Sequence, residues 1–269
     1  MSGTDVIGII GGGGWLGRAL GRAMLRQTFV DPRALVVSSR SGHCSGYEEW
    51  PQVRMFRDNR ALAAQADVVV LSVRPEDFDA IDIQAPGKLV ISLMAGVPAN
   101  LISQRTKSRR VVRAMPNAAA EIGRSYTPWF SLVEASAKER TFVQSMFETC
   151  GQADEVPQES DIDYMTGLTG SGPALPALVS QAMINHAIAR GLAPSVARRA
   201  VKSVVAGASQ LLAADDVDIP SVIDTFLAYD GTTAAALAAM QRSGLEPAIH
   251  AGLEAAEARA MSMSAERNG

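Results

Sequence analysis

A glycine-rich segment near the N-terminus limits the folds open to this chain more than any other feature. The segment I-G-I-I-G-G-G-G-W-L-G spans Ile7–Gly17, after the β-branched run Val6–Ile10 and at the start of the amphipathic run Trp15–Gln27. Glycines between a strand and a helix permit a tight turn and let the backbone approach a pyrophosphate at the helix N-terminus. The segment therefore predicts a dinucleotide-binding loop, rather than a turn that serves packing alone.

Two registers of the G-x-G-x-x-G pattern fit this segment, and the sequence leaves both open. They are Gly12-Gly14-Gly17 and Gly11-Gly13-Leu16, the second with leucine in the third place. The physical role of the glycines is the same in either register. We expect cofactor contacts from six consecutive residues: Gly11, Gly12, Gly13, Gly14, Trp15 and Leu16.

Short β-branched runs alternate with helical patterns through the first half of the chain. After Val6–Ile10, the expected strands are Ala34–Val37, Val68–Val73, Lys88–Leu93 and Arg109–Arg113. Such alternation favours a parallel, doubly wound sheet with right-handed crossovers. The predicted fold class is α/β, with a Rossmann NADP-binding domain over residues 1–157.

The second half, residues 158–269, changes to an all-α pattern after Val156-Pro157. The expected helices are Ala174–Arg190, Ser195–Ala213, Thr233–Arg242 and Glu246–Ser262. Gly191 and Gly244 are typical of helix ends, and Pro194 and Pro220 of helix starts. Because Ala-rich helices make a thin core alone, we expect this dimerisation domain to pack against a second subunit, as a homodimer or larger homo-oligomer.

The end of the second expected strand indicates which dinucleotide is preferred. An NAD site usually places Asp or Glu there for the ribose hydroxyls, and none is present. Ser38, Ser39 and Arg40 instead offer hydroxyl groups and a guanidinium, which suit a 2′-phosphate. We predict NADP(H), with NAD(H) the less favoured cofactor; the alternative is that Arg40 is a solvated surface residue.

Three further segments follow strands at the sheet edge where α/β proteins bind ligands. They contribute the expected cofactor contacts Ser72, Val73, Arg74, Pro75, Met94, Ala95 and Asn117. The Asn117 side chain can bond a nicotinamide amide or orient the substrate.

Composition excludes several classes of protein. A net charge of −3 gives no basic field for nucleic acid or an anionic membrane. The two cysteines, Cys44 and Cys150, exclude a disulfide framework, and the histidines have no metal-ligand spacing, so no metal site is expected. We find no signal-peptide pattern and no apolar window near the ~20 residues of a membrane span. We therefore expect a cytoplasmic protein.

Four segments, in order along essentially the whole chain, are similar to the motifs of one known family. A-D-V-V-V-L-S-V-R-P (Ala66–Pro75) is similar to the family's strand with a Val-Lys-Pro end, and V-V-R-A-M-P-N (Val111–Asn117) to its Met-Pro-Asn loop. I-D-Y-M-T-G-L-T-G-S-G-P-A (Ile162–Ala174) is the most specific match, close to Leu-Ser-Gly-Ser-Gly-Pro-Ala. D-G-T-T (Asp230–Thr233) falls where the family has a Ser-Pro-Gly-Gly-Thr-Thr-type loop.

On these four segments, the chain resembles pyrroline-5-carboxylate reductases. The resemblance implies hydride transfer from NAD(P)H to the C=N carbon of 1-pyrroline-5-carboxylate, which yields proline. It also implies an intertwined dimer, in some members assembled into a decamer, with the active site between nucleotide and helical domains. The substrate carboxylate then needs a receptor, and free amides at a helix start suit one. We expect substrate contacts from Gly231, Thr232, Thr233 and Asn117, and catalytic contacts from Thr233 and Ser171.

The sequence departs from the family around the expected substrate site. Ser-Pro-Gly-Gly is replaced by Ala228-Tyr229-Asp230-Gly231, and Gln181 and Asn185 stand where the family often has two acids. An inward Asp230 would repel a substrate carboxylate, whereas an outward one could cap the helix. Two alternatives therefore stay open: a same-fold reductase of a different cyclic imine or oxo-acid, and a non-catalytic NADP-binding paralogue.

Overall fold

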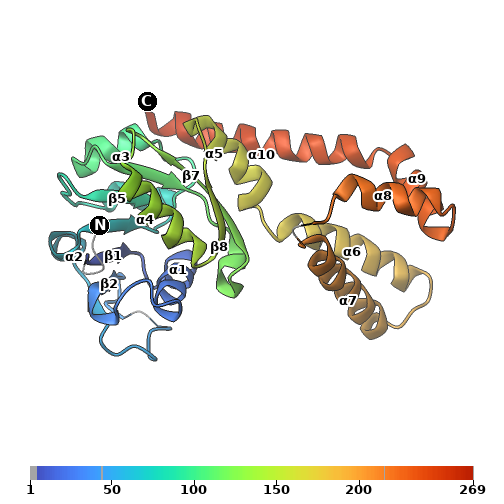
Figure 1. Ribbon diagram of the computed structural model, residues 1–269, viewed down its shortest axis with the longest axis horizontal. Coiled ribbons are helices and arrows are strands. Elements are labelled where there is room, and N and C mark those ends of the chain that lie inside the picture. The colour runs from blue at the N-terminus through green and yellow to red at the C-terminus, as the bar shows by residue number, and fades with distance from the viewer. Residues whose placement is uncertain (1–4, 44, 215, 269) are drawn as a thin grey trace. The chain divides into compact units, whose positions relative to one another are not determined.

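The computed structural model describes residues 5–43, 45–214 and 216–268, so Cys44 lies outside the described residues. The chain forms two compact units, Met1–Gly172 with Leu253–Gly269, and Pro173–Gly252 (Figure 1). This division falls later in the chain than the boundary between residues 157 and 158 that the sequence predicts. The sequence-based boundary separates a nucleotide-binding part from a dimerisation part, and that functional division stays a prediction. The Cys150 thiol is buried, and burial raises its pKa to about 11.

The first unit contains one eight-stranded sheet in the order β3-β2-β1-β4-β5-β6-β7-β8. Its strands are β1 (Ile7–Ile10), β2 (Leu35–Ser38), β3 (Arg54–Phe56), β4 (Val68–Leu71), β5 (Leu89–Ser92), β6 (Val111–Ala114), β7 (Ser125–Ser131) and β8 (Gly151–Glu155). β1 to β6 are parallel, and β7 is antiparallel to β6. The predicted α/β class and the five predicted strands are confirmed, whereas β3, β7 and β8 were not predicted.

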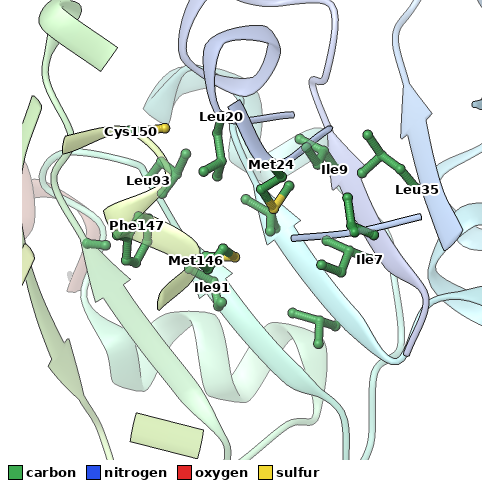
Figure 2. Packing of buried hydrophobic residues seen from close by; sticks show 14 of the residues in the cluster. Ile7, Ile9, Leu20, Met24, Leu35, Ile91, Leu93, Met146, Phe147 and Cys150 are labelled. Atoms are coloured by element: carbon green, nitrogen blue, oxygen red, sulfur yellow. The ribbon is translucent and has the colours of Figure 1, made fainter. Parts of the chain in front are cut away.

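Helices cover both faces of this sheet. They are α1 (Trp15–Arg26), α2 (Asn59–Gln65), α3 (Ala99–Thr106), α4 (Ala137–Glu148) and α5 (Glu159–Met165), with 3₁₀ turns at Pro32–Ala34, Pro75–Ala80 and Ala118–Ile122. In β4, Val68 and Val70 pack under α1 and α4, while Val69 and Leu71 pack under α2 and α3. These contacts form two apolar clusters, one on each face of the sheet. Figure 2 shows the cluster on the side of α1 and α4, where labelled side chains of these helices face the strands. Burial on both faces explains why the strands of this sheet form unbroken apolar runs.

The second unit is helical, as predicted. It contains α6 (Ala174–Ala189), α7 (Pro194–Leu212), α8 (Ile219–Ala228), α9 (Thr232–Arg242) and the start of α10 (Leu245–Asn268). Gly191 and Gly244 have left-handed φ angles of 93° and 83° after α6 and α9, and Pro194 and Pro220 lie in first helical turns. The sequence analysis marked the start of α8 at Pro220 but assigned it no range. Among the described residues, no helix is long and apolar enough to cross a membrane.

The end of α10 packs within the first unit. A Cβ placed on Gly96 would lie 2.5 Å from the Cβ of Met263, and one on Gly167 would lie 2.9 Å from the Cβ of Ala256. Glycine is thus required at both positions for the helix to approach this closely.

A buried ion pair ties α5 to the sheet. Arg113 on β6 is 1% exposed, and its guanidinium donates to Glu159 at 2.8 Å and to Asp163 at 2.9 Å. Glu159 also accepts the backbone N–H of Ala99 at the start of α3. Because the two acids are one helical turn apart, a single guanidinium holds both. The contacts of Arg113 with both acids hold helix α5 on the sheet, just before the turn Thr166–Gly170.

We expect Arg113→Ala to lower the free energy of unfolding by about 3–5 kcal/mol, because it leaves two partly buried carboxylates without their cation. Urea denaturation of the purified variant measures this loss. Arg140→Ala is the matched control, since its pair with Glu155 is exposed and should contribute ~0–1 kcal/mol. Equal losses in the two variants would contradict the role assigned to Arg113.

Candidate active site

The glycine loop lies where the strand order of the sheet reverses direction. It leaves the carboxyl end of β1, which has β2 on one side and β4 on the other. In open α/β sheets this crevice is the place where ligands bind. The predicted cofactor segments after β1, β2 and β4 therefore meet at one edge.

The structure divides the expected glycine roles between the two registers. Gly11 has a φ of +83°, and a Cβ there would lie 2.3 Å from the carbonyl oxygen of Ser72. A Cβ on Gly17 would lie 2.7 Å from the carbonyl oxygen of Gly11, so Gly17 permits the close packing of helix on strand. The tight turn is at Gly11, the first position of the register Gly11-Gly13-Leu16. The close packing is at Gly17, the last position of the register Gly12-Gly14-Gly17.

The helix that follows is open to an anion. Gly14 is the N-cap of α1 and provides no side-chain cap; its own N–H donates to the Gly11 carbonyl at 2.9 Å. The amides of Trp15 and Leu16 are in the first turn, where an α-helix offers them no partner. A side chain on Gly12 would collide with β2. Free amides, a helix N-terminus and a loop without side chains fit a pyrophosphate.

Ser38 holds the glycine loop rather than facing a ligand. It is fully buried, and its carbonyl accepts the N–H groups of Gly11 at 3.1 Å and Gly12 at 3.0 Å. Its hydroxyl donates to Asn59 at 2.7 Å. The predicted contact of the Ser38 side chain with the cofactor is thus replaced by a supporting role, which a sequence pattern does not distinguish.

The turn Ser39–His43 follows β2 and is exposed. The Ser39 hydroxyl closes the turn by donating to the His43 carbonyl at 2.8 Å, and Arg40 lies 3.9 Å from Asp77 with its side chain 93% exposed. A second guanidinium lies here, because Arg57 Nε donates to the Ser41 carbonyl at 3.1 Å. The sequence analysis missed Arg57 because it follows β3, which was not predicted. Recognition of β3 as a parallel strand beside β2 would have indicated Arg57 as a candidate, because it directly follows the carboxyl end of that strand.

The remaining cofactor candidates occupy different environments. Val73 is partly buried and packs on the apolar cluster between the sheet and helices α2 and α3. Arg74 is exposed beside Glu76, and Pro75 begins a 3₁₀ turn. Met94 is 2% exposed within the core, so any cofactor contact there comes from its backbone. Ala95 is partly exposed.

Asn117 joins the Met-Pro-Asn loop to the signature segment. Its amide group donates to the Thr169 carbonyl at 3.0 Å, and its side-chain oxygen accepts the Ala119 N–H at 2.9 Å. Its backbone N–H donates to the Ser125 hydroxyl at 3.0 Å. One amide hydrogen and one lone pair are left over for a nicotinamide or a substrate. That role stays a prediction.

The signature segment contains a π-helical turn over Thr166–Gly170. Its wider spacing is visible in the Ser171 N–H, which donates to the Thr166 carbonyl five residues earlier at 3.0 Å. Gly172 follows with a φ of +46° against Asn117, and Ser171 is partly exposed. The sequence predicted only a turn before a helix here. Single π-helical turns frequently lie at functional sites, and the catalytic role of Ser171 stays a prediction.

The expected carboxylate receptor belongs to the second unit. Gly231 is the N-cap of α9 without a side-chain cap, and Thr232 and Thr233 are exposed in the first turn. Asp230 precedes them with a left-handed φ of 48°. The idea that Asp230 caps this helix is therefore wrong, because the cap residue is Gly231.

Gln181 and Asn185, which stand where the family often has acids, bond each other on α6 at 2.7 Å. Both side chains are exposed within the second unit. They form a neutral pair with hydrogen-bonding capacity to spare. Across the described ranges, no group of three His, Cys, Asp or Glu side chains is arranged to hold a metal ion.

Known proteins match both halves of the chain. A family model described as NADP oxidoreductase, coenzyme F420-dependent, matches residues 6–96, and one described as pyrroline-5-carboxylate reductase dimerisation matches residues 159–263. A pyrroline-5-carboxylate reductase from Synechocystis sp. is 29% identical to this chain, over 96% of this chain and 97% of the relative. One from Thermus thermophilus is 32% identical, over 91% of this chain and 94% of the relative. A pyrroline-5-carboxylate reductase structure from Coxiella burnetii has a TM-score of 0.87 at 28% identity, covering 97% of this chain and 99% of that one.

We expect Gly11→Ala to weaken NADPH binding at least about tenfold, since the new Cβ meets the Ser72 carbonyl and the left-handed backbone costs ~1–2 kcal/mol. Titration calorimetry measures the dissociation constant. Gly87→Ala is the matched control, because Gly87 has a similar φ of +74° but open space around it. If both variants lose affinity equally, backbone strain alone explains the effect, and the crowding argument fails.

Proposed function

The chain belongs to the pyrroline-5-carboxylate reductase family, and on that premise we propose that it reduces 1-pyrroline-5-carboxylate to L-proline with NADPH. The observation that supports this most directly is the glycine loop at the crevice between β1 and β4, which leads into helix α1 without a side-chain cap. The relatives match over almost the full length of this chain, so both the nucleotide-binding part and the helical part of the family are present.

The residues of this chain have simple tasks in such a reaction. The bound cofactor supplies the hydride, and an imine is already electrophilic, so orientation of the two reactants accounts for much of the rate. The first-turn amides of α1 would hold the pyrophosphate. The amides of Gly231, Thr232 and Thr233 receive the substrate carboxylate. The Thr233 hydroxyl would add a contact to that carboxylate. In the first unit, the Ser171 hydroxyl and the Asn117 amide would orient the ring.

We propose a preference for NADP(H) over NAD(H). The end of β2 has no carboxylate to bond ribose hydroxyls, and the turn Ser39–His43 brings two guanidinium groups, Arg40 and Arg57, to the same strand ends. The Arg40 contact with Asp77 is long and exposed, so it holds that guanidinium only weakly. The two cations match a 2′-phosphate, whereas the Ser39 hydroxyl already donates its one hydrogen to the His43 carbonyl.

We propose that the helical part assembles a homodimer or a larger homo-oligomer. Large apolar side chains of the second unit are exposed, including Leu178 at 70%, Leu211 at 76% and Phe226 at 47%. Exposed apolar faces of this kind mark protein interfaces. The match to the dimerisation model covers these helices. The cytoplasmic location expected from the sequence stays a prediction.

Asp230 favours a second candidate, a reductase of the same fold for a different cyclic imine or oxo-acid. It occupies a left-handed position where the family loop has glycine, and it places a negative charge next to the proposed carboxylate receptor. A cyclic imine without a carboxylate would not meet that repulsion, so Asp230 supports the imine form of this candidate and not the oxo-acid form.

The activity itself is tested with purified protein, NADPH and 1-pyrroline-5-carboxylate, with proline as the measured product. We expect NADPH oxidation that depends on the pyrroline and exceeds the rate with other cyclic imines and 2-oxo acids. Faster turnover of another imine would favour the second candidate. NADPH binding without turnover of any substrate would indicate a non-catalytic paralogue.

Replacing both Arg40 and Arg57 by Ala should raise the KM for NADPH at least about tenfold and leave the KM for NADH unchanged, because charge-assisted hydrogen bonds to a phosphate contribute ~1.5–3 kcal/mol each. Initial rates with each cofactor provide both constants. Arg33→Ala is the control, as Arg33 is also exposed but precedes β2 instead of following it. A parallel rise for NADH would argue against 2′-phosphate recognition.

Asp230→Gly should lower the KM for 1-pyrroline-5-carboxylate about fivefold, because two unit charges ~4 Å apart in water repel by ~1 kcal/mol. Glycine also suits the left-handed backbone at this position. Asp216→Gly, an exposed acid before α8, serves as the control. An unchanged KM would show that Asp230 turns away from the substrate.

A further inference from the structure

A tyrosine that the sequence analysis did not single out lies directly beneath the glycine loop. Tyr47 comes from the connection between β2 and β3 and is 1% exposed. Just before it, Gly46 has a φ of +97° and donates its N–H to the Glu48 carboxylate at 2.8 Å. This local turn directs the chain so that the Tyr47 ring enters the core under α1.

The Tyr47 hydroxyl bridges the loop and the helix. It lies 3.2 Å from the carbonyl oxygen of Gly12 and 3.3 Å from that of Gly17. Its single proton is shared between these two acceptors. Gly12 is in the turn and Gly17 is in the first turn of α1, so one hydroxyl joins the two parts of the proposed pyrophosphate site.

Helix α1 makes room for this contact at Gly21. A Cβ there would lie 2.4 Å from the Tyr47 hydroxyl oxygen and 3.1 Å from ring carbons. Glycine inside a helix is destabilising by roughly 0.5–1 kcal/mol relative to alanine. A helix-interior glycine against the ring is therefore explained by the tyrosine that it admits.

We propose that Tyr47 is a positioning residue for cofactor binding: its hydroxyl holds the Gly12 and Gly17 carbonyls so that the amides between them stay directed at the pyrophosphate. This rests on the proposed function only in that the ligand is NADP(H). A loop already fixed in its binding geometry loses less entropy when the ligand arrives. The hydrogen bonds to the Gly12 and Gly17 carbonyls act on the pyrophosphate end of the cofactor site, whereas the turn Ser39–His43, which follows β2, faces the 2′-phosphate end.

The test compares Tyr47→Phe with the parent protein, using two probes. NADPH contains the pyrophosphate, and adenosine 2′-monophosphate does not. We expect the dissociation constant of NADPH to rise about 3- to 10-fold, as for one lost hydrogen bond, and that of adenosine 2′-monophosphate to stay unchanged. In steady state the KM for NADPH rises while kcat at saturating cofactor is retained. A second variant, Gly21→Ala, displaces the ring and should weaken NADPH binding at least as much.

Tyr126→Phe is the matched control, since it removes a partly buried hydroxyl elsewhere. Tyr126 lies on β7, where burial raises its pKa to about 12 and a hydrogen bond to Asp154 adds to the rise. Its loss should leave NADPH affinity unchanged. The proposal is overturned if Tyr47→Phe binds NADPH like the parent, if both probes weaken together, or if Tyr126→Phe has the same effect. Failure of the proposed function appears separately, as absent pyrroline-dependent turnover in the parent protein while binding still responds to Tyr47.

Discussion

The closeness with which the glycine loop lies on the ends of β2 and β4 determines most of the nucleotide-binding architecture. The Ser38 carbonyl accepts two loop amides, and the Ser72 carbonyl leaves no room for a side chain on Gly11. From this contact follow the uncapped start of α1, the accessible first-turn amides and the space below the loop that Tyr47 fills. A loop that stood an ångström further from the strands would admit side chains but would lose this alignment.

The nucleotide-binding half was predictable because its central strands are buried on both faces. Val68–Leu71 is apolar without interruption, and such runs are recognisable without knowledge of their neighbours. The strands at the two sides of the sheet escaped prediction for the converse reason. Arg54–Phe56 is short and mostly exposed, and Gly151–Glu155 has one buried residue and no β-branched side chain. Missing β3 also concealed Arg57, since strand ends indicate ligand contacts only where the strand itself is recognised.

The substrate side was less predictable because its arrangement depends on contacts between distant residues. The motif around Ser171 was found by resemblance, but its π-helical turn and its bond to Asn117 join positions 52 residues apart. Likewise, nothing in the order V-V-R-A shows that Arg113 is buried against two acids of α5. Local pattern separates strand from helix, whereas the pairing of polar groups is settled by the tertiary fold.

The return of α10 has a consequence for dissecting this molecule. The first unit is assembled from two separate stretches of chain, because Leu253–Gly269 packs with Met1–Gly172. Gly96 and Gly167 lack side chains where Met263 and Ala256 approach them. A fragment that ends at residue 172 would expose both of these surfaces to water. The nucleotide-binding half therefore cannot be excised by a single cut, and a permuted chain that joins the two stretches directly is the natural route to an isolated domain.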